Sequence, residues 1–320
     1  MSAFRPDRRN LLAGMALAPV VAGLPACVRA ENQAGDQAGV TPVASTDGTY
    51  VTRPIRGVEV PVIGIGTARS YADPSPEETT ELRATVAEFV RLGGKVIDTA
   101  PSYGRAEEVV GELVSGLGVR NELYLATKVA ADDFAASQAQ IEDSFIKLQT
   151  GFIDLVAVHN LRNWREVLPY LRDLRDADRI GAVGITTSSD RQYDELAQVI
   201  ESQELDCVQV DYALDQRSAD ERILPMAQER GIPVMINLPF GRGRLFDATE
   251  DLPLPGWAAE IGAETWAQVF LKYLAGHPAR PIPIPGTGRV RYVADNLGAA
   301  RPPLPDQAMR RMMEAFVDAL

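Results

Sequence analysis

The chain has 320 residues, of which 46% are hydrophobic and 24% charged, so it is expected to be a soluble globular protein with one barrel-sized domain or two smaller ones. Its net charge of −12 argues against binding to nucleic acid, because neutralising phosphates requires clustered lysine and arginine, which no segment supplies. Two cysteines do not make a disulfide framework, and two histidines cannot form a histidine-rich metal site, so no metal centre is expected.

The chain begins with a predicted export signal over residues 1–30. Arg8 and Arg9 precede an uncharged stretch, 10–28, that is rich in alanine, leucine and glycine but too short and too weakly apolar for a membrane span. The sequence DRRNLL resembles the signal of the bacterial twin-arginine pathway, which exports folded proteins. We therefore expect the twin-arginine machinery to be a partner, and the protein to be exported to the periplasm. A disordered cytosolic leader is the alternative.

The end of this signal offers two processing sites. Leu24–Cys27 (LPAC) resembles a lipoprotein processing box, which would make Cys27 a lipid anchor to the membrane on the periplasmic side. Cleavage near Ala30 by an ordinary signal peptidase is the alternative. Residues 31–48 are polar or small and lack periodicity, so they are predicted to be a linker, and the folded domain is expected to span residues 49–320.

From Tyr50 onward, apolar stretches alternate with segments of helical periodicity. Ser75 and Glu78 form a capping box with Pro76 between them, which predicts the start of the first helix. The predicted strands are Val60–Gly66, Lys95–Asp98, Leu123–Lys128, Ile153–His159, Ile180–Thr186, Asp206–Tyr212, Ile232–Asn237 and Pro281–Pro285. The predicted helices are 75–90, 107–115, 135–148, 164–174, 193–200, 220–229 with a kink at Pro225, 266–273, 290–297 and 306–320.

Strands with continuous apolar runs, each followed by a helix, predict a parallel sheet that helices cover. Eight such units over the folded segment match the size of a closed (β/α)8 TIM barrel, about 250 residues. A doubly wound open sheet is the alternative. That fold usually has the spacing G-x-G-x-x-G after its first strand, and GIGTARS lacks it.

Four chemically matched side chains follow three neighbouring predicted strands. Asp98, Lys128 and His159 end the second, third and fourth strands, and Tyr103 follows Asp98 in a loop with proline and glycine. Each residue alone is most simply explained as a solvated strand end or a packing residue. Their joint occurrence at the face where barrels carry their active sites predicts a site for proton transfer.

These residues also carry a resemblance to a known family. DTAPSYG with a following Glu, LYLATK, DLVAVH and the later IPGT and DN resemble the aldo/keto reductases, in the same order, over about residues 50 to 300. The resemblance implies that Asp98, Tyr103, Lys128 and His159 are the catalytic residues. It also implies an enzyme that reduces aldehydes or ketones with NADPH, or with NADH as the alternative, bound without a Rossmann domain.

The chemistry of these side chains agrees with that role. Hydride transfer to a carbonyl carbon creates an alkoxide that needs a proton donor and a positive potential. Tyr103 is expected to be the acid, with the ammonium of Lys128 lowering its pKa from about 10. Asp98 would hold Lys128 charged and in place, and His159 would orient the carbonyl oxygen.

The segment that should hold the cofactor matches the family only in part. Thr186 and Thr187 stand where relatives often have Ser-Asn, Asn237 stands where an aromatic ring often stacks on the nicotinamide, and Tyr292 stands where an arginine is frequent. Phe240 is a candidate to cover the ring, and Arg289 or Arg291 a candidate for the 2′-phosphate of NADPH. The residues expected at the cofactor are Gly66, Thr67, Thr186, Thr187, Gln209, Asn237, Pro239, Gly241, Arg242, Gly286, Thr287, Arg289 and Asn296. The alternative for the last segment is a simple barrel-closing turn and helix cap.

Two functions remain open at this level. The first is an active reductase of small carbonyl compounds, with Phe240, Phe246, Trp257 and Trp164 as candidate pocket walls. The second is a sensor or accessory lipoprotein that binds a nicotinamide dinucleotide with little or no turnover, which the altered cofactor positions favour. Export adds a tension, because free NADPH is not expected outside the cytoplasm. A protein exported folded would resolve it by carrying a tightly bound cofactor.

Overall fold

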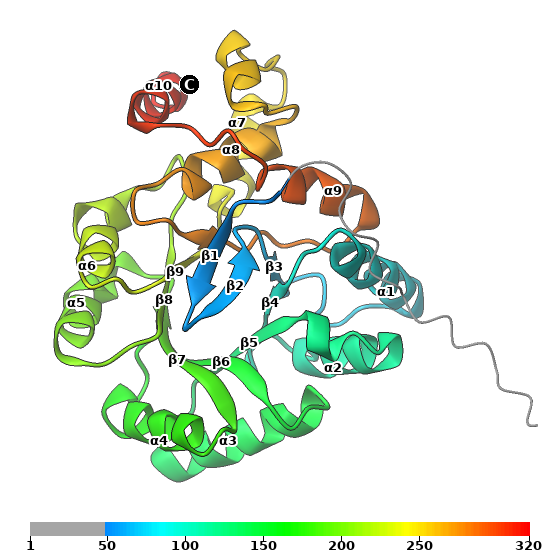
Figure 1. Cartoon of the computed structure of the whole chain (residues 1–320), viewed down its shortest axis with the longest axis vertical. Coiled ribbons are helices and arrows are strands. Elements are labelled where there is room, and N and C mark those ends of the chain that lie inside the picture. The colour runs from blue at the N-terminus through cyan, green and yellow to red at the C-terminus, as the bar shows by residue number, and fades with distance from the viewer. Residues whose placement is uncertain (1–48) are drawn as a thin grey trace, which may run out of the picture. The chain divides into compact units, whose positions relative to one another are not determined.

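A computed structural model describes residues 49–320, so the predicted export signal, the linker and Cys27 lie outside the described residues. Eight parallel strands form one sheet in the order β10-β9-β8-β7-β6-β5-β4-β3. Figure 1 shows these strands surrounded by helices. The strands are β3 (Ile65–Gly66), β4 (Val96–Asp98), β5 (Tyr124–Val129), β6 (Ile153–His159), β7 (Ile180–Thr187), β8 (Cys207–Asp211), β9 (Val234–Asn237) and β10 (Ile282–Pro283).

The two ends of this sheet meet, which makes it a closed barrel rather than the doubly wound open sheet. The amides of Gly64 and Gly66 donate to the carbonyl oxygens of Pro283 and Pro285, each at 3.0 Å. Glycine is required here, because a Cβ on Gly66 would lie 2.8 Å from the carbonyl oxygen of Ile284. The predicted (β/α)8 fold is therefore confirmed.

The helices that follow the strands also agree with the periodicity. Ser75 caps the first helix as predicted, since its side chain accepts from the amide of Glu78 and the Glu78 carboxylate accepts from the amide of Ser75. The helices are α1 (Pro76–Arg91), α2 (Ala106–Leu117), α3 (Phe134–Lys147), α4 (Trp164–Asp176), α5 (Tyr193–Ser202), α6 (Ile223–Glu229), α7 (Arg244–Thr249), α8 (Trp266–Ala275), α9 (Val290–Gly298) and α10 (Gln307–Val317).

The prediction for the first strand was wrong, because its apolar run covers parts of two strands. Residues 58–61 belong to an antiparallel hairpin of β1 (Thr52–Ile55) and β2 (Val58–Pro61), and only Ile65–Gly66 joins the barrel. Ile55 and Val60 are fully buried in a cluster with residues from the starts of barrel strands, such as Val96 and Cys207. The hairpin therefore closes the amino-terminal end of the barrel (Figure 1).

Two further predictions are corrected. Pro225 does not kink a long helix, because α6 begins at Ile223 and Pro225 lies in its first turn, where no intrahelical amide donor is needed. Residues 218–221 form a separate 3₁₀ helix before it. The stretch between β9 and α8 is not a plain loop, since it contains α7 and 3₁₀ helices at 241–243 and 256–261.

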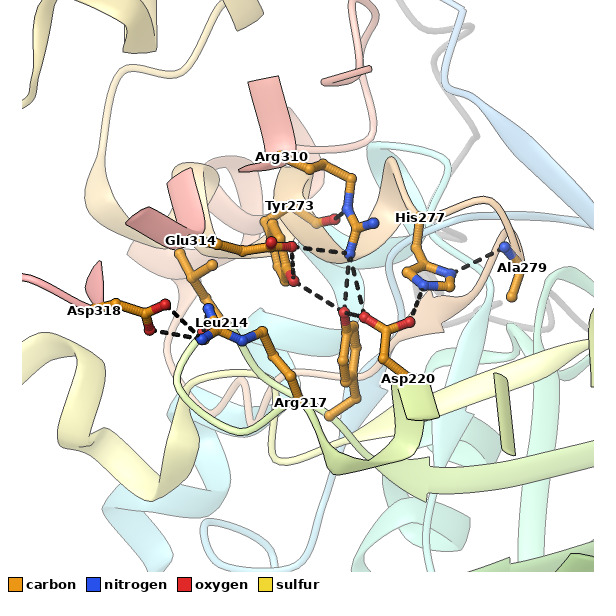
Figure 2. A network of polar contacts seen from close by, with 10 residues as sticks. Leu214, Arg217, Asp220, Tyr273, His277, Ala279, Arg310, Glu314 and Asp318 are labelled. Carbon is orange, nitrogen blue, oxygen red and sulfur yellow. Dashed lines mark hydrogen bonds and ion pairs between the residues drawn. The ribbon is translucent and has the colours of Figure 1, made fainter. Parts of the chain in front are cut away.

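A buried polar network attaches α10 to the barrel (Figure 2). Arg310 donates to the hydroxyl of Tyr212 at 2.9 Å and to the carbonyl oxygen of Tyr273 at 3.2 Å. The Tyr273 hydroxyl donates to Glu314 at 2.7 Å, and Asp220 accepts from Tyr212 and bonds His277.

Within residues 49–320, no helix is both long and apolar enough to cross a membrane. The same part of the chain holds no group of three His, Cys, Asp or Glu side chains placed to bind a metal ion.

Replacing Arg310 with methionine is expected to lower the free energy of unfolding by about 3–5 kcal/mol, because it removes the cation from buried hydrogen-bonded partners. Arg310 is 5% exposed, and its guanidinium also lies 4.3 Å from the centroid of the Tyr273 ring. Urea unfolding followed by circular dichroism measures the change. The exposed neighbour Arg311 is the control, and Arg311→Met should stay within about 0.5 kcal/mol of wild type. Equal midpoints for the two variants would contradict a stabilising role for the network.

Candidate functional site

A cavity of about 430 Å³ opens at the carboxyl ends of the barrel strands and is called the main cavity here. Asp98, Tyr103 and His159 line it, together with predicted cofactor residues from the ends of β3, β7, β9 and β10. Of the residues predicted to bind the cofactor, those in its lining are Gly66, Thr67, Thr186, Asn237, Pro239, Arg242 and Gly286. The structure therefore brings the two predicted groups of residues to one site.

Lys128 lies beneath this cavity and is paired with Asp98. Its Nζ lies 2.6 Å from Asp98 Oδ2 and also donates to the carbonyl oxygen of Thr99 at 2.9 Å. The side chains of Lys128 and Asp98 are only 1% and 4% exposed. Burial is the largest single effect and acts to lower the pKa of Lys128, but Asp98 and Tyr103 together outweigh it and raise that pKa, so the ammonium stays charged.

Tyr103 lies between Lys128 and His159. Lys128 Nζ is 5.0 Å from the centroid of the tyrosine ring, and the ring meets the imidazole of His159 edge-on at 6.0 Å between centroids. The expected direction of its pKa shift is corrected. Lys128 does act to lower the pKa of Tyr103, but burial outweighs this charge and raises it. The phenol is therefore fully protonated at neutral pH.

His159, the last residue of β6, is held neutral. Burial is the largest cause and the charges of Lys128 and Arg162 add to it, which together lower the pKa of His159 to about 4. Its Nδ1 lies 3.5 Å from Ser102 Oγ, which leaves Nε2 to face a ligand. A neutral imidazole in this position can donate one hydrogen bond to a carbonyl oxygen without delivering a full positive charge.

The pH dependence of kcat/KM should therefore show no inflection near pH 6.5, the ordinary pKa of histidine, and should fall only as the pH approaches 4. The same shift affects stability. Between pH 6.5 and about 4 the unfolded chain binds a proton at His159 that the folded protein does not, so this stabilisation is complete above pH 6.5 and is lost as the pH falls. A steady-state pH profile tests the first statement, and a break near pH 6.5 that His159→Gln removes would contradict it.

A second cavity of about 400 Å³ adjoins the main cavity and is called the side cavity. Phe240, Phe246 and Gly286 line both cavities. The side cavity is also lined by residues that do not reach the main cavity, among them Trp266, Tyr292, Asp295 and the predicted residue Asn296. Asn296 donates to Thr287 Oγ1 at 2.9 Å. An aromatic slot of this kind suits a flat heterocycle such as adenine.

The remaining predicted cofactor residues do not line either cavity. Thr187 bonds Gln192 instead, Gly241 lies against the Asp215 carboxylate, and Arg289 precedes α9 as its N-cap residue. Thr287 supports the lining through its bond from Asn296. Gln209 is 2% exposed in the middle of β8, and its side chain lies beside Asp98, where its hydrogen bond acts to lower the pKa of that carboxyl.

The residues present fit a nicotinamide dinucleotide. Thr186 and Asn237, near the carboxyl ends of β7 and β9, present a hydroxyl and an amide to the main cavity, which matches a polar ligand group. Asn237, where an aromatic ring was noted as frequent, directs its amide to Thr186 Oγ1 at 3.5 Å. Phe240, as anticipated, lines the cavity beside it and packs on Phe246 with 4.8 Å between ring centroids. An aromatic surface is thus present although position 237 itself holds no aromatic residue.

The sequence analysis missed three polar residues that line the main cavity and wrongly expected two tryptophans there. Arg69, Ser70 and Ser188 line the main cavity, and their only signal was a position just beyond a strand end. Trp164 and Trp257, expected as pocket walls, lie outside the lining. Trp164 donates to Glu195, and Trp257 packs against Phe316 of α10.

Comparison with known proteins agrees with the geometry of the site. The model of the aldo/keto reductase family matches residues 62–316. The chain is 32% identical over 206 residues to aldo-keto reductase YhdN of Bacillus subtilis, a match that covers 59% of this chain and 61% of that protein. It is 27% identical over 266 residues to methylglyoxal reductase YeaE of Escherichia coli, with coverages of 81% and 92%. A crystal structure of an aldo-keto reductase from Klebsiella pneumoniae in complex with NADPH is similar with a TM-score of 0.71 at 25% identity, covering 85% of this chain and 96% of that one.

Proposed function

Because the chain belongs to the aldo/keto reductase family, we propose that it reduces aldehydes or ketones to alcohols with NADPH, and that Tyr103 is the general acid. The observation that carries this proposal is the convergence of Tyr103, His159 and the buried Lys128–Asp98 pair on one cavity. The NADPH complex of the Klebsiella pneumoniae relative supports the choice of cofactor.

When bound, NADPH supplies the hydride that attacks the carbonyl carbon. His159, neutral by burial, donates a hydrogen bond from Nε2 to the carbonyl oxygen and so orients it. Tyr103 gives its phenolic proton to the oxygen as the alkoxide forms, which completes the alcohol. The charge of Lys128, 5.0 Å from the tyrosine ring, stabilises the phenolate that remains, and Asp98 holds Lys128 in position.

The cofactor residues divide between the two cavities. Thr186, which pairs with Gln209 on the neighbouring strand, and Asn237 would hold the carboxamide end, while Arg242 in the loop after β9 would face the pyrophosphate. The side cavity, with Trp266 and Asn296, would take the adenosine. Arg291 donates to the hydroxyl of Tyr292, which lines this cavity, at 2.8 Å. A guanidinium at this place would pair with the 2′-phosphate of NADPH, which NADH lacks, and this favours NADPH.

The second candidate is a sensor or accessory protein that binds the dinucleotide with little turnover. It is favoured by the changed residues at the carboxamide end, where Asn237 bonds Thr186 and Thr187 bonds Gln192. The sensor function explains cofactor binding but does not explain why a charged Lys128 is buried beside Tyr103. Turnover therefore separates the two candidates.

We also propose that the protein is exported by the twin-arginine machinery, because DRRNLL and the apolar stretch that follows resemble its signal. We propose further that Cys27 carries a lipid that anchors the protein to the periplasmic side of the membrane. Because this pathway carries folded proteins, the cofactor would travel bound. An exported enzyme would then recycle it in place by coupling the oxidation of one substrate to the reduction of another.

The test is to purify the protein from the envelope fraction, record co-purifying nicotinamide absorbance, and measure NADPH oxidation with a panel of aldehydes and ketones. Carbonyl-dependent oxidation supports the reductase. Tight NADPH binding without oxidation by any carbonyl compound would select the sensor. Recovery of the protein only from the cytosol would remove the proposal of export without affecting the reductase.

A further inference from the structure

The main cavity carries an excess of positive charge that carbonyl reduction does not require. Two arginines, Arg69 and Arg242, line it, whereas its one carboxylate, Asp98, is already paired with Lys128. Among residues 49–320, neither arginine has a carboxylate within ion-pair distance. In a chain with a net charge of −12, arginines without acidic partners at the mouth of a cavity indicate that the missing anion comes from a ligand.

The backbone of Arg69 is held firmly while its side chain remains exposed. The loop between β3 and α1 turns at Arg69, whose carbonyl oxygen accepts from the amide of Ala72 at 3.2 Å. On one side, Ala72 accepts from the amide of Arg105 at 2.7 Å, next to the Tyr103 turn. On the other side, the hydroxyl of Tyr71 donates to Thr287 at 3.2 Å. A side chain with a fixed base and a free charged end is well placed to bind a small anion.

The two arginines have different surroundings. Burial raises the pKa of Asp211, and the charge of Arg242 opposes this, so Arg242 lies in the field of an acid. Arg242 also belongs to the loop proposed above to face the pyrophosphate. Arg69, in the loop after β3, lines the same cavity and is the arginine there to which the proposed function assigns no part of the cofactor.

The potential beside His159 is also positive. With Lys128 and Asp98 counted as a neutral pair, the remaining charged group that acts on the pKa of His159 is the cation Arg162. Arg162 is paired at the rim with Asp132, whose side chain is 91% exposed, so solvent screens that carboxylate strongly. A negatively charged substrate would gain from this potential, while a positively charged one would be repelled.

We propose that the preferred substrates are carbonyl compounds that carry a carboxylate, and that Arg69 binds this carboxylate while Tyr103 and His159 engage the carbonyl group. This inference rests on the proposed reductase function and specifies its substrate class. Arg69 has the planar fork of donors that matches a carboxylate, which a lysine would lack.

A matched pair of substrates tests the inference: para-carboxybenzaldehyde and its methyl ester, which differ in charge but present the same aldehyde. The wild-type enzyme should show a kcat/KM about tenfold higher for the acid than for the ester, which corresponds to one charge-assisted hydrogen bond. Arg69→Gln should lower this ratio by about tenfold relative to wild type, a comparison in which the different electrophilicity of the two aldehydes cancels. Arg311→Gln, which removes an exposed arginine from α10, should retain the wild-type ratio.

Each other outcome overturns the inference in a distinguishable way. Reduction of both compounds by wild type without preference would contradict the anionic substrate class and leave the reductase standing. Reduction of neither would remove the proposed function, and the inference with it. A weaker dissociation constant for NADPH in Arg69→Gln, with an unchanged ratio of acid to ester, would assign Arg69 to a cofactor phosphate instead.

Discussion

Replacing Tyr103 with phenylalanine is expected to reduce kcat for aldehyde reduction by about three orders of magnitude, the typical contribution of a positioned general acid. Phenylalanine keeps the ring that packs against His159 and beneath which Lys128 lies, so the cavity and its affinity for NADPH should be preserved. Only the proton donor is lost. Steady-state oxidation of NADPH gives kcat, and quenching of protein fluorescence gives the dissociation constant of the cofactor.

Tyr170→Phe provides the control for this experiment. Tyr170 lies on α4, packs against Phe134 and does not line the main cavity, so the same loss of a hydroxyl there should leave kcat unchanged. Equal rates for wild type and Tyr103→Phe would exclude Tyr103 as the acid. If Tyr103→Phe bound NADPH markedly more weakly, the tyrosine would instead be part of the cofactor site.

Replacing Lys128 with methionine should cost both folding stability and activity. The ammonium is 2.6 Å from Asp98 and fully enclosed, so removing it leaves a carboxylate buried without a counter-charge, which typically destabilises a protein by about 3–5 kcal/mol. The same change removes the positive charge that stabilises the Tyr103 phenolate. The double variant Asp98→Asn/Lys128→Met should recover much of the stability and none of the activity. Urea unfolding of the four proteins in the cycle yields the coupling energy directly.

A surface pair serves as the reference for that cycle. Lys147 and Asp143 are 2.7 Å apart on α3 but are 30% and 52% exposed, so Lys147→Met should cost less than about 1 kcal/mol. A cost for Lys128→Met no larger than that of Lys147→Met would show that water reaches the buried pair. In that case the pair would not provide the fixed charge that the proposed mechanism requires.

The barrel strands could be predicted because burial on both sides of a parallel sheet makes their sequences continuously apolar. The ends of β4 and β6 at Asp98 and His159 agree with the prediction, since a charged or polar residue ends each run. The hairpin of β1 and β2 could not be found in this way. Val60 is buried by barrel residues distant in sequence, and its apolar run continues into β3 without a break.

The candidate site shows a similar division. Asp98, Tyr103, Lys128 and His159 stand in motifs, so their meeting at one cavity follows from the strand order. The net direction of the Tyr103 pKa shift could not be predicted from the sequence, because it depends on how completely neighbouring loops bury the ring. Arg69 carries no motif signal, and its place in the lining depends on contacts that Ala72 and Tyr71 make with the loops on either side.

The closure of the barrel between Gly64–Gly66 and Pro283–Pro285 has a consequence for dynamics. In parallel strands the amide and carbonyl of one residue face the same neighbour, so Pro283 and Pro285 accept from β3 but have no amide to return. Apart from the bridge that pairs Gly66 with Gly286, the seam therefore lacks returning hydrogen bonds, and it should open before any other when the native protein fluctuates. Gly66 and Gly286, on the two sides of the seam, both line the main cavity, so a ligand that contacts both would hold the two sides together. Amide hydrogen exchange at Gly64 and Gly66 is therefore expected to be fast in the free protein and to slow markedly when the cofactor binds.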